Sequence, residues 1–210
     1  MPARADLQRD VHEEVVGVSK VNQAKFDNAV LYLLRGLRSK PGQTQLVKLL
    51  YFADRQHYRQ FLSPITGGRY VALQKGPVID DYKQLFADLV ERNVVDIEQV
   101  DLGSPLPKSE YSPRQDVDLA VLSDSERMVL DQVIAVYGDE TGTALSQITH
   151  RDGPWLFAWD PNREGVPIPY ILFRWLDNMP DDEDLVLAKE GLKSPVLKRR
   201  ISELNSVAMA

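Results

Sequence analysis

The stretch from Lys48 to Val78 reads KLLYFADRQHYRQFLSPITGGRYVALQKGPV and combines helix, turn and strand signals. Apolar residues recur at every third or fourth position in its first half, which predicts an amphipathic helix. Ser63-Pro64 and Gly67-Gly68 then predict a turn. Residues 69–74 alternate like a strand that stops at Gly76-Pro77. The block therefore predicts a helix, a turn and a short strand in direct succession.

A second helix is predicted before this block, and the two should pack as an antiparallel pair. Helical periodicity runs from Lys25 to Ser39, and Pro41-Gly42 ends it. Thr44 is the expected N-cap of the next helix, whose inner stripe reaches His57. The polar side chains expected on the outer side of that helix are Lys48, Arg55, Gln56 and Arg59.

A hairpin and further helices are predicted downstream. Residues 94–100 and 108–112 are candidate strands, separated by a turn-rich segment. Ser123 and Glu126 have the spacing of a capping box, in which each side chain bonds the other residue's backbone amide. The helix that follows should end at Gly138, and another is expected over residues 143–150.

These elements predict an α+β fold that is predominantly helical. A helical core should carry a small antiparallel β-sheet formed by residues 69–74, 94–100 and 108–112. We expect residues 1–22 to be a loose lead-in and residues 23–179 to form one domain. Residues 180–210, with an acidic run and then a basic run, are expected to form a peripheral helix and a tail.

Composition excludes several classes of function. The 210 residues include no cysteine, so disulfides, thiolate nucleophiles and cysteine-based zinc sites are ruled out. The N-terminal residues lack the apolar core of a signal peptide, and no apolar run reaches the length of a membrane span. A cytoplasmic protein without membrane contact is expected. The net charge of −6 requires a local basic patch for any binding to nucleic acid.

Two separated blocks resemble one protein family. The first joins KLLYFAD, PITGG and GPV within residues 48–78, and the second joins LSDSE, YG, LSQITH and GPW within residues 122–155. Together they resemble the Panacea domain, also called SocA-like, of bacterial and phage-encoded antitoxins, over about residues 26–159. The sequence departs from the family at Gly68, where an acidic residue is frequent, and at Ile79-Asp80. The structural residues of the family motif correspond here to Tyr51, Asp54, His57, Gly67, Gly76, Pro77 and Trp155.

The resemblance implies an antitoxin that acts by binding and has no enzymatic activity, cofactor or metal. Its partner would be a cognate toxin encoded by the adjacent gene, and the family does not fix which toxin. Some relatives present a bound toxin to a protease, so a proteolytic adaptor is the first alternative. The final residues, VAMA, would suit a protease recognition tail. A homo-oligomer is left open.

Residues that could carry chemistry have a structural explanation as well. Asp54 and His57 lie one helical turn apart, which would suit a metal or acid–base pair. A working site needs a third ligand or an orienting group, and no such motif is present. We expect a packed histidine hydrogen-bonded to Asp54. The glycines at 67–68 and 76 lack the spacing of a phosphate-binding loop and are expected in turns.

Operator DNA is a further candidate partner. Residues 124–137 and 143–150 could form a helix-turn-helix, with Ser146 and Gln147 facing the bases. The second helix contains no lysine or arginine, and Arg151 comes just after it. Because phosphate contacts dominate affinity for DNA, nucleic acid is an improbable partner apart from an autoregulated operator.

The best candidate for a partner surface is a set of arginine, tyrosine and lysine side chains. Arginine and tyrosine are favoured at interfaces because they combine large contact area with directional hydrogen bonds. The alternative is a solvated helix face beside core aromatic residues. The predicted contact residues are Arg55, Tyr58, Arg59, Arg69, Tyr70 and Lys75.

Overall fold

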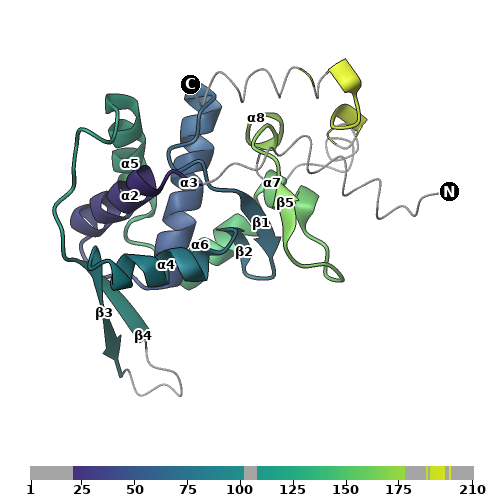
Figure 1. The fold of residues 1–210 in the computed structure, drawn as a ribbon. Helices are drawn as coiled ribbons and strands as arrows, with labels where there is room; N and C mark the ends of the chain where they lie inside the picture. The colour runs from purple at the N-terminus through teal and green to yellow at the C-terminus, as the bar shows by residue number, and fades with distance from the viewer. Residues whose placement is uncertain (1–20, 102–107, 178–187, 189, 197–198, 200–210) are drawn as a thin grey trace.

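The computed structural model describes residues 21–101, 108–177, 188, 190–196 and 199. Helix α3 (Gln43–Phe61) is the centre of the fold, and twelve of its nineteen residues are buried. A helix that is apolar on most sides is stable only when other elements surround it. Helices α2, α5, α6 and α8 and strand β2 all pack against α3 (Figure 1).

The predicted fold class is confirmed: the protein is α+β and predominantly helical. Helix α2 (Gln23–Gly36) precedes α3, and Asn22 caps it by accepting a hydrogen bond from the Lys25 amide. The other described helices are α4 (Tyr82–Glu91), α5 (Asp124–Tyr137), α6 (Gly142–Thr149), α7 (Gly153–Ala158) and α8 (Leu172–Trp175).

Two local helix signals have different outcomes. Ser123 and Glu126 form the predicted capping box at the start of α5. Thr44 is not the N-cap of α3, because the N-cap is Gly42, two residues earlier in the chain. The helix before it ends at Gly36, and the chain is extended at Leu37, so the predicted end at Ser39 is too late.

The strands form two separate sheets, which corrects the prediction of one. Strand β1 (Tyr70–Leu73) lies between β2 (Gly76–Ile79) and β5 (Val166–Ile168), and both pairings are antiparallel. Gly76 was expected to end the strand. Instead its φ of +95° closes a two-residue turn and returns the chain along β1. Pro77 is tolerated because β2 is an edge strand.

The strands predicted at 94–100 and 108–112 pair only with each other. Strands β3 (Val95–Val100) and β4 (Lys108–Pro113) form a hairpin with Ile97 opposite Tyr111. Figure 1 shows this hairpin pointing away from the helices. Its exposed residues leave little apolar surface to hold a third strand, which explains why it does not join β1.

The chain after α8 adds a small second cluster. Ala188 and Leu192 pack against Ile171, Leu172 and Leu176. Most of residues 180–210, and all of residues 1–20, lie outside the described part of the chain. The predicted lead-in, tail and protease signal are therefore not described by the structure. Within the described residues, no helix combines the length and apolarity that a membrane crossing requires.

Candidate functional site

Asp54 is the centre of a buried hydrogen-bond network that holds the 65–70 turn. Its carboxylate accepts hydrogen bonds from the amides of Ile65 and Thr66 at 2.7 and 2.8 Å. It also accepts from the Thr66 hydroxyl and, at 2.8 Å, from the phenol of Tyr70. Burial raises the pKa of Asp54, and the hydrogen bonds from Thr66, Tyr70 and Ile65 oppose that rise. With four donors in place, this carboxylate has a structural role.

His57 does not bond Asp54 as predicted. Its Nδ1 donates to the carbonyl oxygen of Ser63 at 2.5 Å, and its Nε2 lies 3.1 Å from Ser125 Oγ on α5. The imidazole therefore joins α3 to the turn that follows it and to α5. The prediction of a packed histidine is confirmed, because His57 is only 4% exposed. The Asp54 carboxylate instead accepts from Ile65, Thr66 and Tyr70.

A second buried carboxylate, Asp152, ties α7 to α3. It accepts a hydrogen bond from the phenol of Tyr51, and its Oδ1 lies 2.9 Å from Arg55 Nε. The Arg55 contact is an ion pair without hydrogen-bond alignment, since neither atom has a hydrogen-bond partner. Desolvation raises the pKa of Asp152, and the Arg55 charge opposes that rise. The indole of Trp155 donates to the Leu73 carbonyl at 3.0 Å and so joins α7 to β1.

These networks give both buried aspartates structural partners. No group of three or more acidic or histidine side chains in this part of the chain is placed to hold a metal ion. The buried acids are already bonded to structural partners. The glycines at 67 and 76 have positive φ values, as the turn prediction required.

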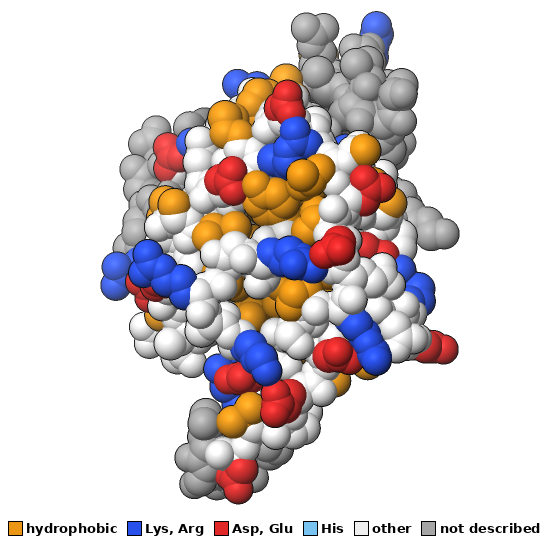
Figure 2. All heavy atoms as spheres, turned by 90° about the vertical axis from the view of Figure 1, so that its left-hand side faces the viewer, with side chains coloured by type: hydrophobic (Ala, Val, Ile, Leu, Met, Phe, Trp, Pro, Cys, Tyr) orange, Lys and Arg blue, Asp and Glu red, His pale blue; other side chains and the backbone are white. Residues whose placement is uncertain are grey.

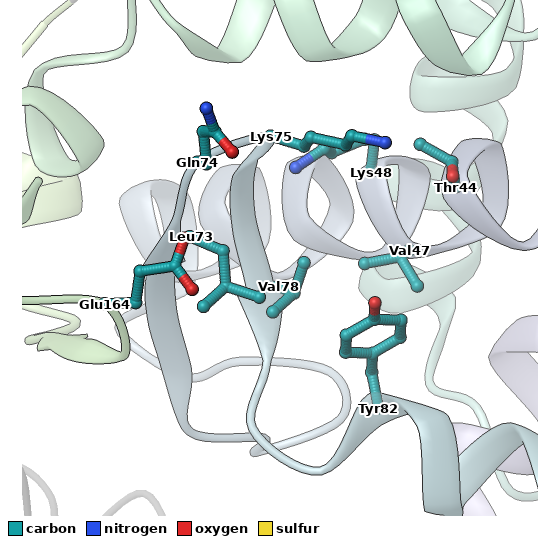
Figure 3. A pocket seen from close by; sticks show the side chains of 9 residues that line it. All are labelled: Thr44, Val47, Lys48, Leu73, Gln74, Lys75, Val78, Tyr82 and Glu164. Carbon is teal, nitrogen blue, oxygen red and sulfur yellow. The ribbon is translucent and has the colours of Figure 1, made fainter. Parts of the chain in front are cut away.

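A cavity lies beside the β1–β2 turn and is lined in part by a buried lysine. The cavity has a volume of about 210 Å³, and Figure 3 shows the nine side chains around it. We call it the lysine pocket; its lining residues are Thr44, Val47, Lys48, Leu73, Gln74, Lys75, Val78, Tyr82 and Glu164.

Lys48 forms the floor of the lysine pocket and is only 1% exposed. Its ammonium donates to the Pro77 carbonyl at 2.8 Å. Desolvation lowers the pKa of Lys48 to about 7, so the side chain changes charge near neutral pH. The sequence analysis placed Lys48 on the solvated face of α3. That prediction is wrong, because β2 covers this face of the helix.

Gly76 allows the backbone to approach Lys48. A Cβ atom at this position would lie 2.6 Å from Lys48 Nζ and 2.4 Å from Thr149 Oγ1. The glycine therefore serves both the turn geometry and the packing of the hairpin on α3 and α6. The only sequence signal for this contact between Gly76 and Lys48 is that a lysine and a Gly-Pro turn both lie within residues 48–78.

The predicted partner surface does not form one continuous face. Tyr58 and Tyr70 are 2% and 0% exposed, which corrects the expectation that they point outward. Both rings are packed in the aromatic cluster around Phe173. Arg55 is largely enclosed by its pairing with Asp152.

The other three predicted residues reach the surface at different places. Arg59 pairs with Asp177 at 2.7 Å, and its side chain is 35% exposed. Arg69 lies 3.5 Å from Asp80. Lys75 is exposed on the β1–β2 turn and lines the lysine pocket. Whether these residues contact a partner stays a prediction.

A wider hollow lies between α2, α5 and the segment that connects β4 to α5. It has a volume of about 650 Å³. Figure 2 looks onto this side of the molecule, where hydrophobic side chains gather between charged ones. Two polar contacts cross it, from Tyr32 to Asp131 at 2.8 Å and from Arg35 to Asp116 at 2.5 Å. The sequence analysis did not identify this surface.

The two helices suggested for DNA binding are present, but the second is partly enclosed. Helix α6 packs against α3, and its Leu145 and Thr149 are buried. Gln147 is exposed, whereas Ser146 bonds back to the Gly142 carbonyl at 2.9 Å. Asp139 and Glu140 occupy the turn between α5 and α6. Their charges would repel a phosphate backbone at that turn.

Comparison with known proteins agrees with the motif pattern. A family model described as "Antitoxin SocA-like, Panacea domain" matches residues 46–156. The matched range begins in α3 and ends in α7, so it includes the Asp54 network and most of the lysine pocket. No curated protein and no solved structure matches the chain.

Proposed function

Because the chain belongs to the SocA-like antitoxin family with a Panacea domain, we propose that it is an antitoxin that neutralises a cognate toxin by direct binding. The family match is the observation that carries this proposal, since it covers more than half of the chain. The toxin would be the product of the adjacent gene, and the two proteins would meet in the cytoplasm. An association with phages is part of the same proposal.

The described chemistry supports binding as the mechanism. The acidic side chains of the core are engaged with structural donors, and the described residues offer no metal site. A protein with such a core can inhibit by covering the active surface or substrate site of its partner. Inhibition of this kind is stoichiometric, so one antitoxin molecule is needed for each toxin molecule.

Co-expression with the product of the adjacent gene tests the proposal. The neighbour should arrest growth when it is expressed alone and should become harmless when this chain is present. The two proteins should then purify together, and growth should recover as their ratio approaches one to one. A neighbour that is harmless alone, or that stays toxic and forms no complex, would refute the proposed function.

The same strains separate this mechanism from the alternatives. A proteolytic adaptor would shorten the half-life of the toxin, whereas simple neutralisation leaves that half-life unchanged. An autoregulator would shift a fragment of its own promoter in a salt-sensitive manner. The acidic turn between α5 and α6 leads us to expect no such shift by this chain alone.

A further inference from the structure

The lysine pocket brings two lysines together with one acidic side chain, Glu164. None of the described ion pairs involves Lys48 or Lys75. Lys48 carries three N–H donors, and its one described hydrogen bond is to Pro77. The residue as a whole is 1% exposed, and its side chain is part of the pocket lining. Buried charges in proteins are normally paired, so this ammonium lacks the counter-charge that such a site requires.

The surroundings of the pocket add to its positive character. Thr44, in the first turn of α3, is also part of the lining. Lys75 lies on the rim, where its side chain is exposed. Glu164 is the one acidic side chain among the lining residues. Figure 3 shows it at the far end of the pocket from the lysines.

The remaining walls suit a short aliphatic stem. Val47, Leu73 and Val78 line the pocket, and Tyr82 lies across from the lysines (Figure 3). A volume of about 210 Å³ is several times the roughly 30 Å³ that one water occupies in the liquid. The space is therefore large enough for one carboxylate-bearing side chain and too small for a folded element.

We propose that the lysine pocket receives an aspartate or glutamate side chain of the bound toxin, whose carboxylate pairs with Lys75 at the rim and with Lys48 at the floor. This inference rests on the proposed function and adds the chemistry of one contact. The stem of the acidic residue lies against the apolar wall, and its charge supplies the missing partner of Lys48. In an acidic chain of net charge −6, such a cationic hollow also directs an acidic partner to one place.

A carboxylate fits this pocket better than a phosphate. Phosphate sites usually combine several backbone amides or an arginine fork with a lysine. The lining residues include no arginine, and the pocket has one buried ammonium to balance one negative charge. Carboxylate binding also favours the charged form of Lys48, so binding of the acid and protonation of the lysine are coupled.

This coupling gives the contact a pH dependence that a merely structural lysine would not confer. Since burial lowers the pKa of Lys48 to about 7, the binding affinity should fall as the pH rises above that value. The other charged or titratable side chains that line the pocket with Lys48 are Lys75, Tyr82 and Glu164. His150 lies outside the lining and bonds the Gln74 carbonyl, and a His150→Gln variant is included as a control.

The first experiment uses the free full-length chain with acetate as the probe. Sodium acetate is titrated against sodium chloride of equal ionic strength, and backbone amide resonances are followed by NMR. Saturable shifts should be confined to the pocket-lining parts of α3, the β1–β2 turn and α4, with a Kd on the order of 10 mM that rises about 3-fold in Lys75→Met. Equal shifts in acetate and chloride would overturn the pocket assignment, whatever the identity of the toxin.

The second experiment measures the affinity of the toxin complex at about pH 6.5 and about pH 8.5. Lys48→Met should weaken binding by at least about 30-fold at the lower pH and should abolish most of the pH dependence. Lys75→Met should weaken it about 3-fold, and Glu164→Gln should strengthen it about 2-fold. Lys83→Met, an exposed lysine of α4 outside the pocket, is the matched control and should have no effect.

The outcomes distinguish the two proposals. A wild-type chain that fails to bind and neutralise the neighbour refutes the antitoxin function, while the acetate titration still decides whether the pocket takes a carboxylate. A wild-type complex that is unaffected by Lys75→Met, Glu164→Gln and pH refutes the pocket contact and leaves the antitoxin function intact. Because Lys75 and Glu164 are exposed, their variants report on binding even if Lys48→Met fails to fold.

Discussion

The ammonium of Lys48 donates a 2.8 Å hydrogen bond to the carbonyl oxygen of Pro77, and this contact joins the central helix α3 to the edge strand β2. A lysine in this position is costly, because its charge is removed from water and no carboxylate neutralises it. A methionine would fill the same space without that cost. The cost shows in the dependence of stability on pH, and the close packing around this contact shows in the tolerance of Gly76 to substitution.

The stability of the chain should rise with pH because of Lys48. Its pKa is about 7 in the folded state and 10.5 in the reference state, so the unfolded chain binds more protons between these values. The free energy of unfolding therefore increases with pH across this window, by at most about 1.4 kcal/mol per pH unit. Urea unfolding between about pH 7 and about pH 9.5 measures the slope.

The contribution of Lys48 is isolated by comparing variants. Lys48→Met should show a clearly smaller slope than the wild type, and Lys83→Met should retain the wild-type slope because its side chain is exposed. The same slope in all three proteins would mean that Lys48 keeps its charge in the folded state up to high pH. That result would contradict the desolvation that the geometry implies.

Gly76→Ala should destabilise the chain more than Gly165→Ala, which replaces another glycine with a positive φ. The φ of Gly76 is +95°, and a new Cβ would meet Thr149 Oγ1 and Lys48 Nζ. Gly165 has a φ of +76° and open space around the position of a Cβ. Gly165→Ala should therefore cost about 1 kcal/mol for the backbone alone, and Gly76→Ala about 3 kcal/mol. Thermal unfolding of both variants makes the comparison, and equal losses would exclude a packing role for Gly76.

Much of the local structure was predictable from sequence because its causes are local. The capping box at Ser123 and Glu126 depends on a fixed spacing, and the structure contains it. The positive φ values at Gly67 and Gly76 follow from the turn signals. The family resemblance also pointed to the correct fold class, and the model of that family matches residues 46–156.

The errors concern relationships between distant segments. Periodicity placed Lys48 on an outer face, and the sequence does not reveal that β2 covers that face. Tyr70 was expected at the surface, although its phenol bonds the buried Asp54. Strand β5, in a proline-rich segment, pairs with β1 across about ninety residues. Such contacts are set by tertiary packing, which overrides local propensity.

Asp54→Asn should be strongly destabilising. An asparagine has one acceptor oxygen, so it cannot accept the four hydrogen bonds that reach the Asp54 carboxylate. We expect a loss of about 3 kcal/mol in the free energy of unfolding, measured with urea. Asp80→Asn is the matched control, because Asp80 is partly exposed and only 3.5 Å from one arginine. Its loss should stay below about 1 kcal/mol. A similar small loss for Asp54→Asn would show that the network does not hold the turn.

Arg55 and Arg59 lie one helical turn apart on α3, but their substitution should have different effects. The Arg55 variant should lose stability, whereas the Arg59 variant should lose affinity for the toxin. Removing Arg55 leaves the buried Asp152 without its charge partner, so Arg55→Met should cost about 3 kcal/mol and lower Tm by roughly 6–12 °C. The Arg59 pair with Asp177 is more exposed, so Arg59→Met should cost less than about 1 kcal/mol. If Arg59 contacts the toxin as predicted, its variant should weaken the complex about 10-fold while Tm changes by less than about 4 °C. Calorimetric unfolding and titration of the toxin complex measure both quantities, and unchanged toxin affinity in Arg59→Met would remove Arg59 from the interface.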